Sequence, residues 1–212
     1  MSAEFWHRAW SEGRIGFHEG KPNRFLQRYA GRWSKGRRLL VPLCGKAEDL
    51  AYLASLGHAV VGVELDASAA RAFFAEHGLE PSERTVASFT VLEGAGIEIW
   101  VGDFFATTSE LLGRFDAFYD RAALIALPSD ARPGYVAHLR GLLSEQPHGL
   151  LVALEYEPGV IEGPPFPVPE HEVRTHWGAL GVEDLETDDV DFPRFRAAGI
   201  AGSERCYWLG GS

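Results

Sequence analysis

A glycine turn and a glutamate about twenty residues further on are the residues of this sequence best suited to binding a small molecule. Gly45 lies in the turn from Leu43 to Lys46, and Glu64 follows an apolar run rich in valine. In open α/β sheets, a glycine turn after the first strand lets a ligand approach, and an acidic residue after the second strand accepts hydrogen bonds from ribose hydroxyls. The pair therefore predicts a site for a cofactor that contains a nucleoside.

The turn lacks the additional glycines of a G-x-G-x-x-G sequence. Those glycines allow the backbone and a helix terminus to approach a pyrophosphate, as NAD and FAD require. The single Gly45 favours a nucleoside cofactor without a diphosphate, such as S-adenosylmethionine. The alternative is an ordinary strand-to-helix turn that binds no ligand.

A strand, a helix and a second strand must position these two residues. Leu39 to Val41 is a short apolar run, and the proline that follows it should end the strand. Apolar residues at helical spacing predict a helix from Ala47 to Leu56, followed by Gly57 as a left-handed residue. The run from Val60 to Val63 predicts the second strand, so that the segment forms one βαβ unit.

Two further predicted strands end in charged residues. Asp103 follows the strand that ends near Val101, after a predicted hairpin. Asp120 and Arg121 follow the apolar run Phe115 to Tyr119, and two adjacent charges are not expected in a core. The alternatives to ligand contact are a helix cap for Asp103 and a surface ion pair for Arg121.

The N-terminal segment is rich in aromatic residues. Phe5, Trp6 and Trp10 recur at helical spacing and precede a loop with Gly13, Gly16 and Phe17. These side chains either anchor the segment to the core or form a lid, because aromatic faces attract a sulfonium cation and a closed lid excludes water.

Several sequence blocks, in order along nearly the whole chain, resemble the thiopurine S-methyltransferase family, a branch of the class I S-adenosylmethionine-dependent methyltransferases. The segment VPLCGKxxDLxxLASLGHxVVGVE resembles the cofactor-binding core of that family, and its bacterial members in particular. The other matching blocks are WxxGRIGFH, IEIWVGDFF, YDRAALIALP and GPPFPVP.

The resemblance implies an α/β fold of the Rossmann-like, class I methyltransferase type. We expect a single doubly wound, mostly parallel seven-stranded sheet with helices on both faces and an antiparallel last strand. Residues 1–212 should form one methyltransferase domain, with residues 1–35 as an N-terminal lid and covering helices.

The same resemblance implies roles for individual residues. It places Phe17 beside the methyl acceptor and Arg121 at the boundary between cofactor and acceptor, where Arg121 would act in catalysis through charge and orientation. The residues expected at S-adenosylmethionine are Trp10, Leu43, Gly45, Glu64, Asp103, Phe104 and Arg121. The expected reaction is in-line methyl transfer to a small soft nucleophile, such as the sulfur of a thiopurine or an aromatic thiol. Selenium or tellurium oxyanions are the alternative acceptors.

The composition limits the partners. The formal charge of −10 and the pI near 5.3 argue against a nucleic acid partner and fit a small-molecule acceptor. Two cysteines and the absence of a long apolar run predict a cytoplasmic protein without a membrane span. We expect it to act as a monomer.

A metal site is not expected. His171, Glu172 and His176 resemble a zinc-protease helix, but that motif needs histidines four residues apart, and these two are five apart. Cys44 has no adjacent base, so we expect a packing residue and not a nucleophile. Two other functions remain open from the residues: a nicotinamide-dependent oxidoreductase and a non-catalytic nucleoside-binding module.

Overall fold

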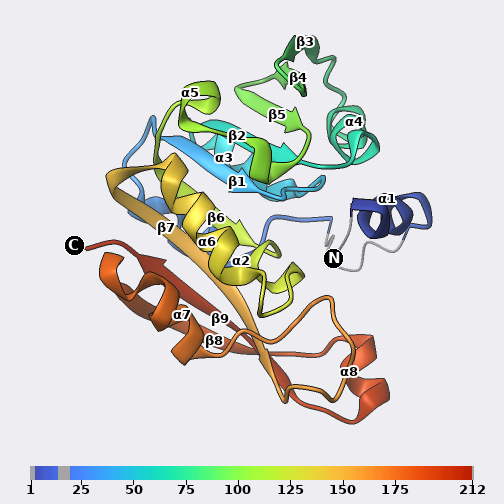
Figure 1. Ribbon diagram of the computed structural model, residues 1–212, viewed down its shortest axis with the longest axis vertical. Coiled ribbons are helices and arrows are strands. Elements are labelled where there is room, and N and C mark those ends of the chain that lie inside the picture. The colour runs from blue at the N-terminus through green and yellow to red at the C-terminus, as the bar shows by residue number, and fades with distance from the viewer. Residues whose placement is uncertain (1–2, 14–19, 212) are drawn as a thin grey trace.

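The computed structural model describes residues 3–13 and 20–211, so the predicted contact of Phe17 lies outside the described residues. In these ranges, nine strands form one sheet in the order β3-β4-β5-β2-β1-β6-β7-β9-β8 (Figure 1). The strands are β1 (Arg38–Pro42), β2 (Ala59–Glu64), β3 (Ser82–Val86), β4 (Phe89–Gly94), β5 (Ile97–Val101), β6 (Phe115–Arg121), β7 (Leu143–Tyr156), β8 (Val182–Val190) and β9 (Gly202–Leu209).

Helices cover both faces of this sheet. The α-helices are α1 (Ala3–Ser11), α2 (Arg24–Tyr29), α3 (Glu48–Ser55), α4 (Ala67–Glu76), α5 (Ser109–Leu112), α6 (Arg132–Leu142), α7 (Glu170–Trp177) and α8 (Pro193–Ala198). Four single 3₁₀ turns accompany them: η1 (Ala30–Arg32), η2 (Phe104–Ala106), η3 (Leu124–Ala126) and η4 (Gly178–Leu180). Within the described parts of the chain, none of the helices is long and apolar enough to cross a bilayer.

The two faces carry separate hydrophobic clusters because successive side chains of a strand point to opposite sides. Leu39 and Val41 of β1 pack in one cluster with residues of α2, α3 and α4. Leu40 packs in the other, which includes residues of α6 and α7. On that second face, the rings of Phe118 and Trp177 stack at 5.1 Å. Burial on both sides explains why the central strands read as continuous apolar runs.

The predicted fold class is confirmed, but the predicted number of strands is wrong. Strands β5, β2, β1, β6 and β7 are mutually parallel, and the last strand, β9, pairs antiparallel with β7 and β8. The sheet has two strands more than the seven expected, because β3 and β4 add an antiparallel hairpin beside β5. Strand β3 is exposed along most of its length, so its sequence, SERTV, has no apolar pattern to reveal it.

The βαβ unit forms as predicted. Helix α3 runs from Glu48 to Ser55, and Gly57 has a φ of 88°, as expected for the left-handed residue after a helix. The predicted end of β1 before Pro42 is wrong. The strand includes Pro42, which lies in register with Val63 of β2.

The chain reverses its direction across the sheet between β1 and β6. From β1 it proceeds outward to β2 and then to β5, and it then returns to place β6 on the other side of β1 (Figure 1). Such a reversal is the usual ligand site of an open α/β sheet, at the carboxyl ends of the strands. A ligand site is therefore expected among the residues that follow β1, β2, β5 and β6.

Candidate active site

The turn after β1 has a strained backbone. Leu43 has a φ of 48° and Gly45 a φ of 55°, a conformation that is uncommon for leucine and free of steric cost for glycine. The amide of Cys44 donates a hydrogen bond to the carbonyl of Val63 at 3.0 Å, which ties the turn to β2. Strain of this kind is frequent where a backbone is held ready for a ligand.

Gly62 of β2 is the position on which this turn rests. A Cβ atom at Gly62 would lie 2.6 Å from the sulfur of Cys44, closer than such atoms approach in proteins. Cys44 is buried, and burial raises the pKa of its thiol well above the ordinary value. Cys44 is therefore suited to packing and not to nucleophilic attack, as its sequence predicts.

Glu64 links the two loops that follow β1 and β2. Its carboxylate accepts hydrogen bonds from the amides of Gly45 and Asp66, both at 2.8 Å. The side chain is buried, and burial raises the pKa of Glu64 although these amides act in the opposite direction. An ionised carboxylate has about four acceptor positions, and the amides of Gly45, Asp66 and Leu65 act on this one, so not all of its positions are occupied. The predicted contact with ribose hydroxyls is compatible with this arrangement.

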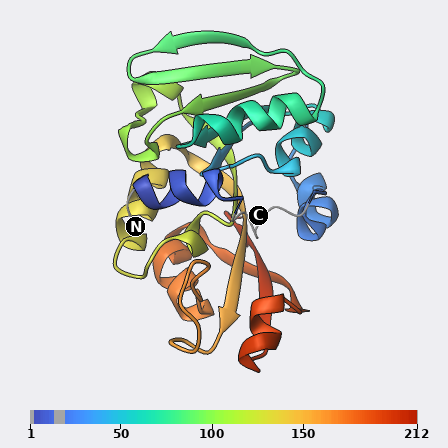
Figure 2. The same cartoon turned by 90° about the vertical axis from the view of Figure 1, so that its right-hand side faces the viewer.

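Asp66 caps α4 and also contacts the N-terminal helix. Its carboxylate accepts from the amide of Ser68 at 2.8 Å, and Nδ1 of His7 lies 2.7 Å from its other oxygen. Burial would raise the pKa of Asp66, but hydrogen bonds from Ser68, His7 and the backbone lower it below its ordinary value. The His7 contact holds α1 at the carboxyl ends of the strands (Figure 1), and Figure 2 shows α1 across the middle of that side.

Trp10 lies on the same helix and is partly buried. The helix lies at the carboxyl ends of the strands, next to Asp66 (Figure 1). The contact of Trp10 with the cofactor remains a prediction.

Asp103 lies beside Glu64 at the end of the neighbouring strand. The amide of Gly102 donates to the carbonyl of Glu64 at 2.9 Å, which joins the ends of β5 and β2. Asp103 is exposed and caps η2, accepting from the amide of Phe105 at 2.9 Å. The sequence offered Asp103 as a cap for a helix from Thr107 onward, but that helix, α5, is capped by Thr108, and Asp103 caps the preceding 3₁₀ turn with its carboxylate accessible.

The two phenylalanines after Asp103 have different surroundings. Phe104 is 2% exposed, and its ring lies 5.5 Å from that of Tyr135 and 5.0 Å from that of His138. Phe105 is 48% exposed. The predicted contact of Phe104 with a base would therefore involve its backbone, whereas Phe105 presents the accessible ring. A two-residue sequence, FF, contains no signal that separates these roles.

Arg121 ends β6 on the other side of β1. It is partly buried, and its charge acts on the hydroxyl of Tyr119, which is hydrogen-bonded to Asp49 at 3.1 Å. Asp49 also accepts from the amide of Asn23 at 2.6 Å. Asp49 thus connects the segment before α2, at Asn23, to the end of β6 near Arg121. The buried Asp49 was not predicted as part of the site, because an acidic residue in a first helical turn is typical of any helix.

The prediction that Asp120 and Arg121 lie outside the core is wrong for Asp120. Asp120 is fully buried and accepts hydrogen bonds from the amide of Leu124 at 3.1 Å and from the hydroxyl of Tyr135 at 2.8 Å. Burial raises the pKa of Asp120 to about 6. Both faces of β6 are covered, so Asp120 is buried like Phe118 and Tyr119 before it, whereas Arg121 ends the strand and is only partly buried.

The proline-rich segment after β7 is an ordered loop. The amide of Phe166 donates to the carbonyl of Ile125 at 2.7 Å, and that of Val168 donates to the carbonyl of Leu154 at 2.8 Å. Strand β6 ends at Arg121, which pairs with Val152, so β6 does not reach Leu154 of β7. Val168 pairs with Leu154 instead. The loop thus borders the end of β6.

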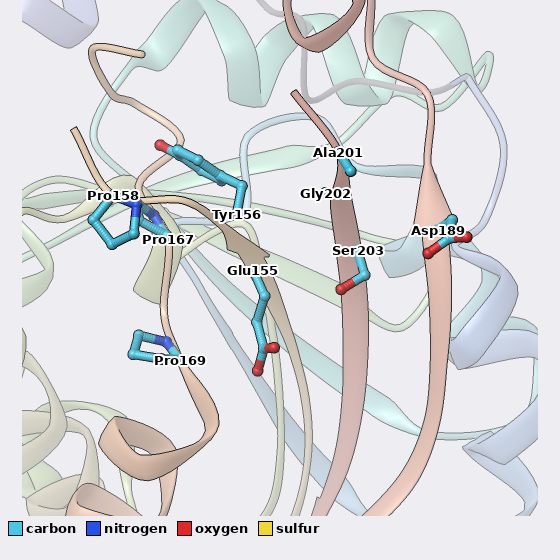
Figure 3. Close-up of a pocket in the computed structure, with 9 residues that line it drawn as sticks. All are labelled: Glu155, Tyr156, Pro158, Pro167, Pro169, Asp189, Ala201, Gly202 and Ser203. Carbon is cyan, nitrogen blue, oxygen red and sulfur yellow. The ribbon is translucent and has the colours of Figure 1, made fainter. Parts of the chain in front are cut away.

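A cavity of about 400 Å³ lies between this loop and the start of β9 (Figure 3). Glu155, Ser203 and Asp189 lie in one register across β7, β9 and β8, and their side chains line it. Pro158, Pro167 and Pro169 form another part of its wall. Two carboxylates make this cavity unsuited to an anionic acceptor, and none of the predicted site residues that the structure describes lines it.

The histidines of α7 have a different role from that of metal ligands. Glu172 binds the buried Arg132 at 2.8 Å, and Nε2 of His176 lies 3.4 Å from the same carboxylate. Among the described residues, no three His, Cys, Asp or Glu side chains are grouped in a way that would hold a metal.

The residues at the switch point fit S-adenosylmethionine better than a dinucleotide. Glu64, Asp66 and Asp103 place three carboxylates at the ends of β2 and β5, which favours a sulfonium cation and disfavours a diphosphate. In the turn after β1, the amide of Gly45 already donates a hydrogen bond to Glu64, and the turn has no glycine-rich loop that could bind a pyrophosphate.

Solved structures share this fold. A Burkholderia thailandensis 1,6-didemethyltoxoflavin-N1-methyltransferase with bound S-adenosylhomocysteine matches 99% of this chain and 87% of its own, with a TM-score of 0.66 and 18% identity. A magnesium protoporphyrin IX methyltransferase from Synechocystis matches 98% of each chain, with a TM-score of 0.65 and 13% identity. The fold is that of the class I S-adenosylmethionine-dependent methyltransferases.

The sequence of the chain identifies its family within the class I methyltransferases. The family model for thiopurine S-methyltransferase (TPMT) matches residues 1–210, and the chain belongs to this family. It is 48% identical over 196 residues to a thiopurine S-methyltransferase of Pseudomonas syringae pv. pisi, which covers 88% of each chain. It is 44% identical over 215 residues to one of Pseudomonas putida, which covers 98% of each. The cofactor is S-adenosylmethionine, and the two alternatives, an oxidoreductase and a non-catalytic module, are set aside.

Proposed function

We propose that the protein transfers the methyl group of S-adenosylmethionine to the sulfur of a thiopurine or an aromatic thiol. One observation carries this proposal: the switch point between β1 and β6 is flanked by the Gly45 turn on one side and by Arg121 on the other. In a member of this family, that arrangement supports a cofactor site and an acceptor site that meet beside β1.

The proposed cofactor side consists of residues on α1 and at the carboxyl ends of β1, β2, β5 and β6. Glu64 is proposed to accept from the ribose hydroxyls and Asp103 from the adenine amino group. The remaining residues proposed to contact the cofactor are Trp10, Leu43, Gly45, Phe104 and Arg121. The carboxylates at this edge favour the positive charge of the sulfonium.

The chemistry requires positioning more than acid or base catalysis. Bound S-adenosylmethionine supplies a methyl group on an activated leaving group. The chain has to align a soft nucleophile behind the methyl carbon and to exclude water. Arg121 would orient an anionic acceptor through its charge, since aromatic thiols and thiopurines are largely ionised near neutral pH.

The N-terminal region is proposed to complete the site. Residues 1–35 would form a lid and covering helices of a single domain that spans residues 1–212, with Trp10 beside the cofactor and Phe17 beside the acceptor. The His7 contact with Asp66 supports this arrangement, because it places α1 over the carboxyl ends of the strands. The acidic composition supports a monomeric enzyme that acts on small molecules and not on nucleic acid, and the presence of only two cysteines supports a cytoplasmic location.

Selenium and tellurium oxyanions are a second acceptor class. The observation that favours them is the permanent charge of Arg121 at the end of β6, which would attract any small anion.

A transfer assay with a panel of acceptors tests the proposal. Isotope-labelled S-adenosylmethionine would be supplied with a thiopurine, an aromatic thiol, selenite, tellurite and a phenol of similar size. We expect the highest kcat/KM with the sulfur acceptors. Transfer to the oxyanions alone would favour the second class, and no transfer to any member would contradict the proposal.

A further inference from the structure

Asp120 is a buried carboxylate with donors from two other elements. The amide of Leu124, in the 3₁₀ turn after β6, lies 3.1 Å from one oxygen, and the hydroxyl of Tyr135, on α6, lies 2.8 Å from the other. The amide of Ala123 also stabilises the charged form. The carboxylate therefore ties the end of β6 to the turn that follows it and to the covering helix.

The turn that Asp120 holds is the one that carries Arg121. The next residue, Ala122, has a φ of 67°, which is disfavoured for a residue with a Cβ atom. Asp120 lies before this strained position, and its partners at Ala123 and Leu124 lie after it. The hydrogen bonds thus close a loop around Arg121 and Ala122, and they resist relaxation of the backbone.

We propose that Asp120 is a positioning residue for methyl transfer, whose ionised carboxylate fixes the turn that orients Arg121 toward the acceptor. The inference rests on the proposed role of Arg121. Asp120 itself would touch neither the acceptor nor the cofactor.

The protonation state distinguishes this role from simple packing. Burial raises the pKa of Asp120 to about 6, so that the charged form is the less favourable one in the folded protein. A side chain needed only to fill space would serve better as a neutral amide. Among the described groups that act on Asp120, Tyr135 of α6 is the titratable one, and the amides of Leu124 and Ala123 face it from the turn.

The experiment compares Asp120→Asn, Tyr135→Phe and Arg121→Met with the wild type. The values of kcat/KM are measured from pH 5 to pH 8 with an aromatic thiol acidic enough to stay ionised throughout, and with a neutral acceptor of similar size. Binding of S-adenosylhomocysteine and the melting temperature are recorded for each protein. Asp116→Asn, at the other end of β6, is the matched control, because Asp116 is paired with Arg37 away from the site.

Asp120→Asn should lower kcat/KM about tenfold on the anionic acceptor and less on the neutral one, with no lower melting temperature at pH 7. The wild-type value should decline below about pH 6, and this decline should be absent in Asp120→Asn. Tyr135→Phe removes a hydrogen bond that lowers the pKa of Asp120, so it should move the midpoint of the decline upward. This shift is decisive if Asp120→Asn does not fold.

The outcomes separate this inference from the proposed function. Full activity of Asp120→Asn together with an impaired Arg121→Met would overturn the role of Asp120 and leave that of Arg121 in place. Equal losses on both acceptors in Arg121→Met would remove the proposed role of Arg121 and the inference with it. An unchanged pH midpoint in Tyr135→Phe would also overturn the inference.

Discussion

Arg121 is the residue through which acceptor charge should affect the rate. Its guanidinium stays protonated at any working pH, so it cannot exchange a proton with the acceptor. Replacement by methionine removes a charge-assisted contact worth on the order of 1.5 to 3 kcal/mol, which predicts a tenfold to hundredfold lower kcat/KM on an anionic acceptor.

Arg121→Lys should recover only part of this loss, because lysine lacks the planar fork that fixes orientation. Cofactor affinity measured beside the rates provides the control. If S-adenosylhomocysteine binding weakens and both acceptors suffer equally, Arg121 belongs to the cofactor site instead.

Gly62 should matter because of the sulfur that lies against it. Gly62→Ala would bring a Cβ atom to 2.6 Å from the sulfur of Cys44. Such overpacking typically destabilises the folded state by about 1 to 3 kcal/mol. We expect a lower free energy of unfolding and weaker S-adenosylhomocysteine binding, since the strained turn would have to move. The double variant Cys44→Ala with Gly62→Ala frees the space and should recover much of both. Additive losses in the double variant would argue against this contact.

For single residues, the sequence predicts which residues lie at the strand ends more reliably than it predicts which of them are buried. Glu64, Asp103 and Arg121 all lie at the predicted strand ends. The burial of Asp120 and Phe104 was not predicted, because both are covered by Tyr135 of α6, and contacts between residues distant in sequence leave no local pattern.

Helix α1 is the element whose function is most open to a direct test. Deleting residues 1–18 should leave a folded core, because the sheet begins at Arg38 and the anchor between Asn23 and Asp49 lies after the deletion. Turnover should be lost, since Trp10, Phe17 and the His7 contact to Asp66 are removed. Circular dichroism, thermal melting and the transfer assay are the measurements.

A variant that lacks only residues 1 and 2 is the control for this deletion. Normal turnover of the longer truncation would show that the aromatic residues are not a lid. Loss of the folded state would show that they belong to the core.

The acidic strand β8 illustrates why net charge alone does not identify a partner. Arg24 binds Asp188 at 2.7 Å and Arg32 binds Glu183 at 2.6 Å, while Arg28 pairs with Glu186. These pairs connect α2 and η1 to the edge of the sheet, and charges on an edge strand also discourage pairing with other chains.

Elements were predictable where periodicity was long or turns were distinctive. The βαβ unit has both features, and it matches the structure closely. Helix α8, with six residues, is too short to show a helical period, and Pro193 and Gly199 at its ends read equally well as a loop.

For the whole molecule, Asp120 should make stability depend on pH in an unusual direction. Its folded-state pKa, about 6, lies above the ordinary 3.8, so the folded state binds more protons than the unfolded state between these values. Its stabilising contribution is complete below about pH 4 and is lost as the pH rises through 6. The difference between these two pKa values corresponds to roughly 3 kcal/mol.

The difference in unfolding free energy between the wild type and Asp120→Asn isolates this contribution from those of the other carboxylates. We expect the wild type to lose up to about 3 kcal/mol relative to the variant between pH 4 and pH 7, measured by urea denaturation. A difference that does not change with pH would show that Asp120 has an ordinary pKa.

The central claim is that the switch point between β1 and β6 binds the cofactor through Glu64. Calorimetric titration with S-adenosylhomocysteine tests it most directly, with NAD as the competing ligand. Glu64→Ala should weaken S-adenosylhomocysteine binding at least tenfold, because two hydrogen bonds to a charged acceptor are lost. Glu80→Ala, at an exposed position before β3, is the control. We predict that the wild type binds S-adenosylhomocysteine and not NAD; unchanged affinity in a folded Glu64→Ala protein would contradict the account.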